Sequence, residues 1–335
     1  MRIIAVANQK GGCGKTTTAI NLSYSLSIRN HKVLLVDCDP QAHATMGLKI
    51  KPSDLEHSLY NVLTPADGHN AALEQIIIPI HEYLHLAPSN IILSAVEQEL
   101  SGVDGREEKL MQALQRIDDQ YAYCIIDCPP SVGLLCFNAL RAASEVIIPI
   151  DMSLFSLRGI AKLLELTVIL KDELGHTITP RALITMYDRR TKYSQRVLDK
   201  VREEFGANAY QTIIRYNIRL RETVDYGLPV GLFDKRSNGH LDYEQLAEEI
   251  AGLKEEAAVL HEDVVTGMTQ DMLQKTECYI GAVMQAVIPE ESLADLEEIL
   301  PPAYKSSYPE MVQALGVGAA ETCAAEDSES EDPLD

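Results

Sequence analysis

Eight residues near the start of the chain have the types and spacing of a loop that binds phosphates. The stretch Lys10–Thr17 reads KGGCGKTT, and it lies between a β-like run and a helix-like run. Glycines let the backbone approach phosphates closely and aim its N–H groups at them. Lys15 is placed to reach the β- and γ-phosphates, and the Thr16 hydroxyl is placed to ligate Mg²⁺. The predicted chemistry is therefore that of a nucleotide phosphate.

The glycines of this loop follow an unusual pattern. Gln9 stands where the ordinary phosphate loop has its first glycine, and Lys10 precedes the paired glycines. A glycine-rich turn without a ligand is the alternative, but the strand, loop and helix context that the motif requires is present. We therefore expect the loop to bind ATP through Lys10, Gly11, Gly12, Cys13, Gly14, Lys15, Thr16 and Thr17.

Two aspartates follow apolar runs further along the chain. Asp39 belongs to the stretch VLLVDCDPQ, and Asp127 ends the stretch YCIID. Carboxylates at the carboxyl ends of parallel strands project into the crevice where open α/β sheets bind ligands. Asp127 suits a role in holding Mg²⁺ through water, and Asp39 a role in orienting the attacking water. The expected Mg²⁺ ligands are Thr16, Asp39 and Asp127, and the expected catalytic residues are Lys10, Lys15, Asp39 and Asp127.

These residues need a scaffold, and the hydrophobic pattern predicts one. Short β-branched runs alternate with longer helix-like stretches, as in a parallel sheet covered on both faces. The fold class expected is therefore α/β and P-loop NTPase-like, with a mostly parallel twisted sheet and helices on both faces. The expected strands are Arg2–Ala7, Lys32–Val36, Tyr123–Ile126, Glu145–Ile150 and Ala182–Thr185.

The charge is distributed unevenly along the 335 residues, whose net charge is −21. Residues 252–335 carry a balance of −16, which leaves −5 for residues 1–251. We therefore expect an ATPase domain over 1–251, an acidic helical extension over 252–315 and a disordered acidic tail over 316–335, because such a composition buries too little apolar surface to fold. The body can still carry a local basic patch.

Composition also excludes some classes of protein. No apolar run is long enough for a membrane-spanning helix, so integral membrane association is not expected. The first residues lack the basic start and apolar core of a signal peptide. The seven cysteines lack zinc-ligand spacing, which favours reduced thiols and a cytoplasmic location.

The chain resembles ParA/Soj-type partition ATPases of the ParA/MinD family from residue 1 to about residue 250. An additional lysine before paired glycines, here Lys10, is the mark of that family's deviant Walker A loop. The matching stretches agree in order and spacing, and they are NQKGGCGKTTTAINLS, VLLVDCDPQAHAT, LAPSNIILSAVEQEL, YCIIDCPPSVG, ITMYDRRTKYSQRVLDKV and NIRLRETVDYGLPVGLFDKRS.

The resemblance implies a nucleotide-switched enzyme with ATP and Mg²⁺ as cofactors. ATP would close a homodimer in which Lys10 reaches the partner's nucleotide. The dimer would bind DNA non-specifically on the nucleoid, and a ParB-like activator protein would stimulate hydrolysis. The segment with Phe233 and Asp234 resembles the one that flanks the adenine base.

The expected DNA-binding residues are Arg215, Arg219 and Arg221. Arg219 lies in a segment that resembles the family's DNA-contacting region, and non-specific binding needs cations near phosphates. A second basic group is formed by Arg189, Arg190, Lys192 and Arg196. The alternative is that these arginines are solvated and balance nearby acidic residues. His43, and Arg221 with Glu222, depart from the residues that family members commonly have there.

Two other functions remain open on the sequence. A ParA-like ATPase can position a protein cargo or act as a regulatory switch, with the acidic C-terminal segment as its adaptor. A metabolic P-loop enzyme, such as a dethiobiotin-synthetase-like ligase or a nitrogenase-iron-protein-like reductase, is the third class. The spacing and the rest of the chain favour the partition ATPases over this third class.

Overall fold

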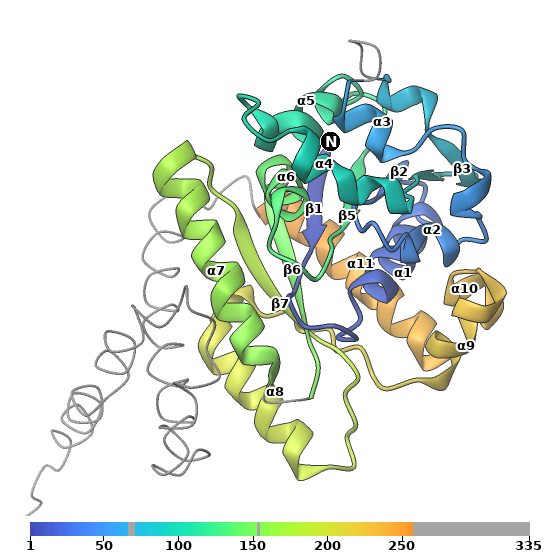
Figure 1. Ribbon diagram of the computed structural model, residues 1–335. Helices are drawn as coiled ribbons and strands as arrows, with labels where there is room; N and C mark the ends of the chain where they lie inside the picture. Colours follow the sequence, from blue (N-terminus) through green and yellow to red (C-terminus); the bar gives the residue numbers. More distant parts are fainter. Residues whose placement is uncertain (66–70, 153–154, 257–335) are drawn as a thin grey trace, which may run out of the picture. The chain divides into compact units, whose positions relative to one another are not determined.

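The computed structural model describes residues 1–65, 71–152 and 155–256 of the chain (Figure 1). All of them belong to the first of two compact units, Met1–Thr266. The disordered tail expected over 316–335, and the helical extension beyond residue 256, lie outside the described residues. Within the described residues, no helix is long and apolar enough to cross a membrane.

A seven-stranded sheet forms the centre of this unit, in the order β3-β4-β2-β5-β1-β6-β7. Every neighbouring pair is parallel except β3 with β4, which is antiparallel. This confirms the expected fold class. The strands are β1 (Arg2–Val6), β2 (Val33–Asp37), β3 (Ile78–His81), β4 (Leu84–Ala87), β5 (Tyr123–Asp127), β6 (Glu145–Ile150) and β7 (Thr179–Ile184).

Helices cover both faces of the sheet (Figure 1). The chain moves from β1 to β2 in one direction across the sheet and from β5 to β6 in the other. Right-handed crossovers therefore place α1 on one face and α6 on the opposite face. The helices are α1 (Lys15–Ser27), α2 (His43–Met46), α3 (Leu59–Leu63), α4 (Val96–Glu99), α5 (Lys109–Gln115), α6 (Leu134–Ala142), α7 (Phe155–Leu174), α8 (Lys192–Phe205), α9 (Ile218–Tyr226), α10 (Val230–Phe233) and α11 (Asn238–Glu256).

Short 3₁₀ turns complete the connections, at Pro52–Asp54, Leu73–Gln75, Ile91–Ala95, Arg106–Glu108 and Gly206–Asn208. Helix α11 packs on α1 and continues to Glu256, past the domain boundary expected at residue 251.

The central strands are buried on both faces, which explains their continuous apolar sequences. Every residue of β2, β5 and β6 is buried. Apolar residues of the strands pack with those of α1 and α11 in one core, among them Leu22, Leu35, Ile125 and Leu246. This core holds the carboxyl ends of β1, β2 and β5 at one edge of the sheet, and the last two strands end in aspartates. The site is built at that carboxyl edge.

Candidate active site

The loop between β1 and α1 has a backbone that only glycine adopts readily. Gly12 and Gly14 have φ angles of 74° and 95°, in the left-handed region. Space is also open around Gly11 and Gly12, where a Cβ atom would meet nothing within 4 Å. Gly14 is the N-cap residue of α1, and no side chain caps that helix. The first N–H groups of a 13-residue helix are therefore free of a side-chain cap at the point where the sequence predicts phosphates.

The side chains of both lysines of the loop have partners within the site. The Lys15 side chain is buried, and its Nζ donates to the carbonyl oxygen of Lys10 at 3.0 Å. Lys10 Nζ forms an ion pair with Asp151, the residue after β6. The Thr185 hydroxyl, just after β7, donates to the Cys13 carbonyl at 2.8 Å and ties the loop to the sheet. Burial raises the pKa of the Cys13 thiol, which favours a packing role for this side chain.

Asp127 and Asp37 are register partners at the ends of β5 and β2. Asp127 is fully buried, and neither carboxylate oxygen has an ordinary hydrogen bond within the part of the chain that the structure describes. Burial raises the pKa of Asp127 well above its usual value, and the Asp37 carboxylate raises it further. The Thr16 hydroxyl lies close enough to lower that pKa, as does Lys15.

The orphaned oxygens of Asp127 fit a hydrated Mg²⁺. This ion keeps several waters, and it is usually held by one or two carboxylates together with substrate phosphates. Across the described ranges, no three His, Cys, Asp or Glu residues are arranged to hold a metal by themselves. The unpartnered Asp127 carboxylate and the neighbouring Thr16 hydroxyl match an ion that arrives with a nucleotide.

Asp39 lies two residues beyond β2, in the loop that leads to α2. It is 6% exposed, and its Oδ1 accepts the Gln41 N–H at 2.9 Å. The Asp37 Oδ1 accepts the N–H of Asp39 itself at 3.2 Å. The structure thus brings Asp39, Asp127 and the loop lysines to the same edge of the sheet, as the sequence predicted. Their catalytic roles stay predictions.

The sequence reasoning missed two carboxylates of this site. Asp37 is fully buried, and desolvation raises its pKa to about 6. Asp151 follows β6 and holds Lys10. Both aspartates stand at the end of an apolar run, as Asp127 does, so the same signal was present for all three.

The two residues expected near the adenine base, Phe233 and Asp234, lie at the end of α10. The Phe233 ring packs against Tyr226, with 4.8 Å between ring centroids. The Asp234 carboxylate pairs with Arg219 at 3.5 Å. The ring contact and the ion pair connect α10 to α9, and the Asp234 Oδ1 also accepts the Arg236 N–H at 3.0 Å. Their role toward the base stays a prediction.

The three expected DNA-binding arginines differ in their surroundings. Arg215 makes a bidentate ion pair with Asp242 of α11, whose side chain is buried. Arg219 is about half exposed and pairs with Glu222 at 2.8 Å. Arg221 is exposed, and its Nη1 donates to the Tyr216 hydroxyl at 3.4 Å. Arg221 is therefore more available to an external anion than Arg215, whereas Arg219 is paired with both Glu222 and Asp234.

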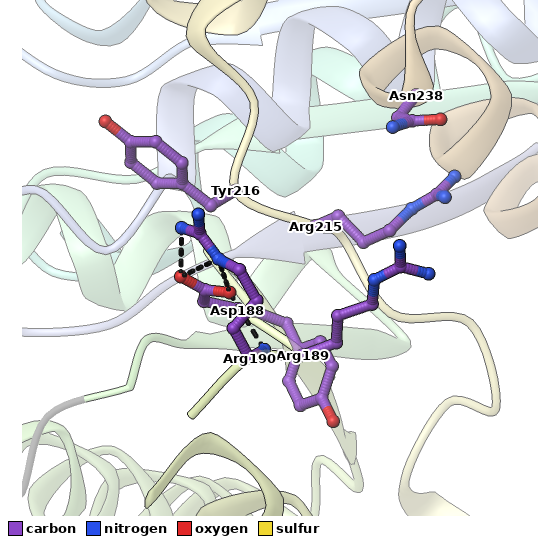
Figure 2. Close-up of a pocket in the computed structure, with 7 residues that line it drawn as sticks. Asp188, Arg189, Arg190, Arg215, Tyr216 and Asn238 are labelled. Carbon is purple, nitrogen blue, oxygen red and sulfur yellow. Dashed lines mark hydrogen bonds and ion pairs between the residues drawn. The ribbon is translucent and has the colours of Figure 1, made fainter. Parts of the chain in front are cut away.

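A hollow of about 410 Å³ lies beside Arg215 (Figure 2). Arg190 turns back onto Asp188, and this pairing lowers the pKa of Asp188 to about 2. Figure 2 shows the Arg189 and Arg215 side chains extending in the same direction, toward Asn238. The lining residues are Tyr187, Asp188, Arg189, Arg190, Arg215, Tyr216 and Asn238. Arg215 of one basic group and Arg189 and Arg190 of the other therefore line the same hollow.

Comparisons with known proteins agree with this architecture. A family described as an AAA domain matches residues 1–179. The sporulation initiation inhibitor protein Soj of Bacillus subtilis is 40% identical over 252 residues, which cover 75% of this chain and 98% of Soj. The chromosome partitioning protein ParA of Myxococcus xanthus is 38% identical over 74% of this chain and 87% of its own length.

A solved structure adds a ligand to the comparison. Cobyrinic acid a,c-diamide synthase from Mycobacterium smegmatis, with bound ADP and magnesium, superposes with a TM-score of 0.64. It is 31% identical to this chain, and the match covers 74% of this chain and 93% of the synthase. The phosphate loop, the sheet order and the extent of these matches agree, so the chain belongs to the ParA/Soj family of P-loop ATPases.

Proposed function

We propose that the protein is an ATP-driven switch for DNA partitioning. ATP binding closes a homodimer that binds DNA without sequence preference on the nucleoid, and hydrolysis, stimulated by a ParB-like partner, releases it. The observation that carries this proposal is the additional lysine of the phosphate loop, Lys10. It lies at the same edge of the sheet as the buried carboxylates of Asp37 and Asp127. The names and extents of the Soj and ParA relatives support the partitioning role.

In the proposed complex, the loop N–H groups and Lys15 Nζ bind the β- and γ-phosphates. Lys15 exchanges its bond to the Lys10 carbonyl for a phosphate oxygen. Thr16, Asp39 and Asp127 would hold Mg²⁺, with Asp127 holding it through water. The bound ion would supply positive charge to the phosphate oxygens.

Hydrolysis requires a water molecule in line with the bond between the γ-phosphorus and the bridging oxygen. A new bond forms between the water oxygen and the γ-phosphorus, the bridging bond breaks, and its electron pair leaves on ADP. Asp39 orients the water and accepts its hydrogen bond. The Lys10 side chain of the partner subunit stabilises the negative charge on the transferring group.

Variants of Lys15 and Asp39 separate binding from turnover. Lys15→Ala should abolish ATP binding, measured with a fluorescent ATP analogue, because the phosphates lose their main side-chain partner. Asp39→Ala should keep that binding, accumulate an ATP-bound dimer in sedimentation, and hydrolyse ATP poorly. Lys51→Ala, which removes an exposed lysine, is the matched control. Normal binding by Lys15→Ala, or normal turnover by Asp39→Ala, would refute the assigned roles.

The DNA surface is tested by salt dependence. Wild-type protein with ATP should bind DNA of any sequence, and the affinity should fall steeply as the salt concentration rises, because the release of counterions from DNA is then less favourable. Arg219→Ala and Arg221→Ala should each weaken binding and reduce the salt slope by about one per lost phosphate contact. Arg116→Ala removes an exposed arginine next to α5 and serves as the control.

Dimer formation with ATP should persist in both arginine variants, because neither residue is assigned to the nucleotide. No ATP-dependent DNA binding by the wild type at low salt would overturn the DNA role and favour a protein cargo.

A further inference from the structure

A closed ring of hydrogen bonds surrounds the backbone of Asp39. Asp37 Oδ2 accepts from the N–H and the hydroxyl of Thr45, at 2.8 and 2.7 Å. Thr45 Oγ1 in turn accepts the N–H of Ser89 at 3.0 Å. The Ser89 hydroxyl donates to the Asp39 carbonyl at 2.8 Å, and the Asp39 N–H donates to Asp37 Oδ1 at 3.2 Å, which closes the ring. The ring therefore includes both the N–H and the carbonyl group of Asp39.

This ring joins three segments and is shielded from water. Asp37 ends β2, Thr45 lies in α2, and Ser89 follows β4. Asp37, Thr45 and Ser89 have no exposed surface. Hydrogen bonds in such surroundings are strong, and an unmade one is costly. The contacts span up to 50 residues of sequence, so no local motif would hold Asp39 in the same way.

The turn between Asp39 and α2 needs such an anchor. Ala42 has a φ angle of 55°, a left-handed conformation that strains any residue with a side chain. The Asp39 carbonyl also accepts the Ala42 N–H at 2.9 Å, so this oxygen anchors the strained turn as well. A loose Asp39 backbone would let the turn relax and move the Asp39 carboxylate.

We propose that Thr45 is a positioning residue for ATP hydrolysis, acting through Ser89 and Asp37 on Asp39. This inference rests on the proposed function, in which Asp39 orients the attacking water. Thr45 is the member of the ring that both donates to Asp37 and accepts from Ser89. Within the described residues, the hydrogen bonds of its hydroxyl go to Asp37 and Ser89, and to neither the phosphate loop nor the expected Mg²⁺ ligands. Thr45 therefore governs the placement of Asp39 and not the binding of nucleotide.

The test compares Thr45→Val with Thr45→Ser. Valine keeps the shape of the side chain and removes the hydroxyl, whereas serine keeps both hydrogen bonds. Thr45→Val should lower kcat by about tenfold or more, because small misplacements of catalytic groups have large effects on rate. Its Kd for a fluorescent ATP analogue should stay within about threefold of wild type. Thr45→Ser should restore kcat to within about threefold.

A control separates this effect from lost stability. Thr64 is also buried, and its hydroxyl donates to the Tyr60 carbonyl in its own segment. Thr64→Val should lower the thermal midpoint without lowering kcat at 25 °C. Ser89→Ala, which removes the donor to the Asp39 carbonyl, is the second variant and should lower kcat in the same way if Thr45→Val does not fold.

A double-mutant cycle distinguishes failure of this inference from failure of the proposed function. In an Asp39→Ala background, Thr45→Val should cost no further turnover, because residues that act as one unit are not additive. Normal turnover by Asp39→Ala would refute the proposed role of Asp39 itself. Impaired turnover by Asp39→Ala, together with wild-type kcat in Thr45→Val and Ser89→Ala, would overturn the positioning role alone. A full additional loss in the double variant would also overturn it.

Discussion

The buried charge of Asp127 should cost the nucleotide-free protein stability, and Asp127→Asn measures that cost. Asparagine has the same shape without the charge. Asp127 is fully buried, its two oxygens lack hydrogen bonds among the described residues, and the Asp37 and Asp39 carboxylates lie close enough to raise its pKa. The positive charge of Lys15 lowers the pKa of Asp127 and so offsets part of this cost. Lys15 is not left without a partner in the variant, because its Nζ still donates to the Lys10 carbonyl. We therefore expect Asp127→Asn to be more stable than the wild type.

The size of the gain follows from two opposing costs. An unpaired buried carboxylate costs several kcal/mol, whereas an amide that lacks a partner costs about 1–3 kcal/mol. A net gain of about 1–3 kcal/mol remains for the variant. For a domain of this size, each kcal/mol moves the thermal midpoint by about 2–4 °C. The expected rise is therefore about 2–12 °C near pH 8.

The dependence on pH gives the decisive signature. A carboxyl whose pKa is raised by folding stabilises the folded state below its unfolded pKa, near 3.9, and loses that contribution as the pH rises through the folded pKa. The difference between Asp127→Asn and the wild type should therefore be small at about pH 4 and grow with pH. Thermal unfolding followed by circular dichroism in EDTA, from acidic to alkaline pH, measures this difference.

The same variant should bind Mg²⁺ together with ADP less tightly than the wild type. Saturating Mg-ADP at about 100 times its Kd should stabilise the wild type by about 2.7 kcal/mol, and the variant by clearly less. A variant that is less stable at every pH, or a difference that does not change with pH, would refute the reasoning. An equal response of both proteins to Mg-ADP would show that Asp127 holds no ion.

Three further variants test other parts of the structure. Glu145→Gln leaves Arg2 and Arg181 without their shared, largely buried carboxylate, so the thermal midpoint should fall by about 6–20 °C (about 3–5 kcal/mol). The control Glu248→Gln changes an exposed ion pair and should change the midpoint by under about 4 °C. Ala42→Gly should raise the midpoint by about 1–4 °C, because glycine relieves the left-handed strain, whereas Ala44→Gly inside α2 should lower it. Asp151→Asn removes the ion pair between Asp151 and Lys10 and should favour the ATP-bound dimer in sedimentation by about fivefold, or about 1 kcal/mol. An unchanged dimer fraction would show that this ion pair does not compete with dimerisation.

The sequence alone predicted the parts of the protein that depend on local patterns. The glycines of the phosphate loop, the continuous apolar strands and the aspartates that end them each occupy a short stretch of chain. Glycine spacing determines where the backbone becomes left-handed, and apolar runs determine which strands are buried. These patterns predicted the phosphate loop and the aspartates at the carboxyl edge of the sheet. They also predicted five of the strands, with small differences at the strand ends.

Other features depended on contacts between distant segments. β3 and β4 were not among the expected strands, and each has only four residues. Antiparallel pairing at the sheet edge made them strands. The parallel register between β2 and β5 placed Asp37 beside Asp127, and burial within the fold raised the pKa of Asp37.

Side-chain partners were decided only by the tertiary structure. Nothing local indicates that Lys10 meets Asp151, that Arg215 is committed to Asp242, or that Thr45 and Ser89 close a ring on Asp39. A polar residue carries no mark of its partner in the sequence, because the partner is chosen by the register of the sheet and the packing of helices on it. The sequence therefore determined the chemistry that the protein carries, and the fold decided which groups hold that chemistry in place.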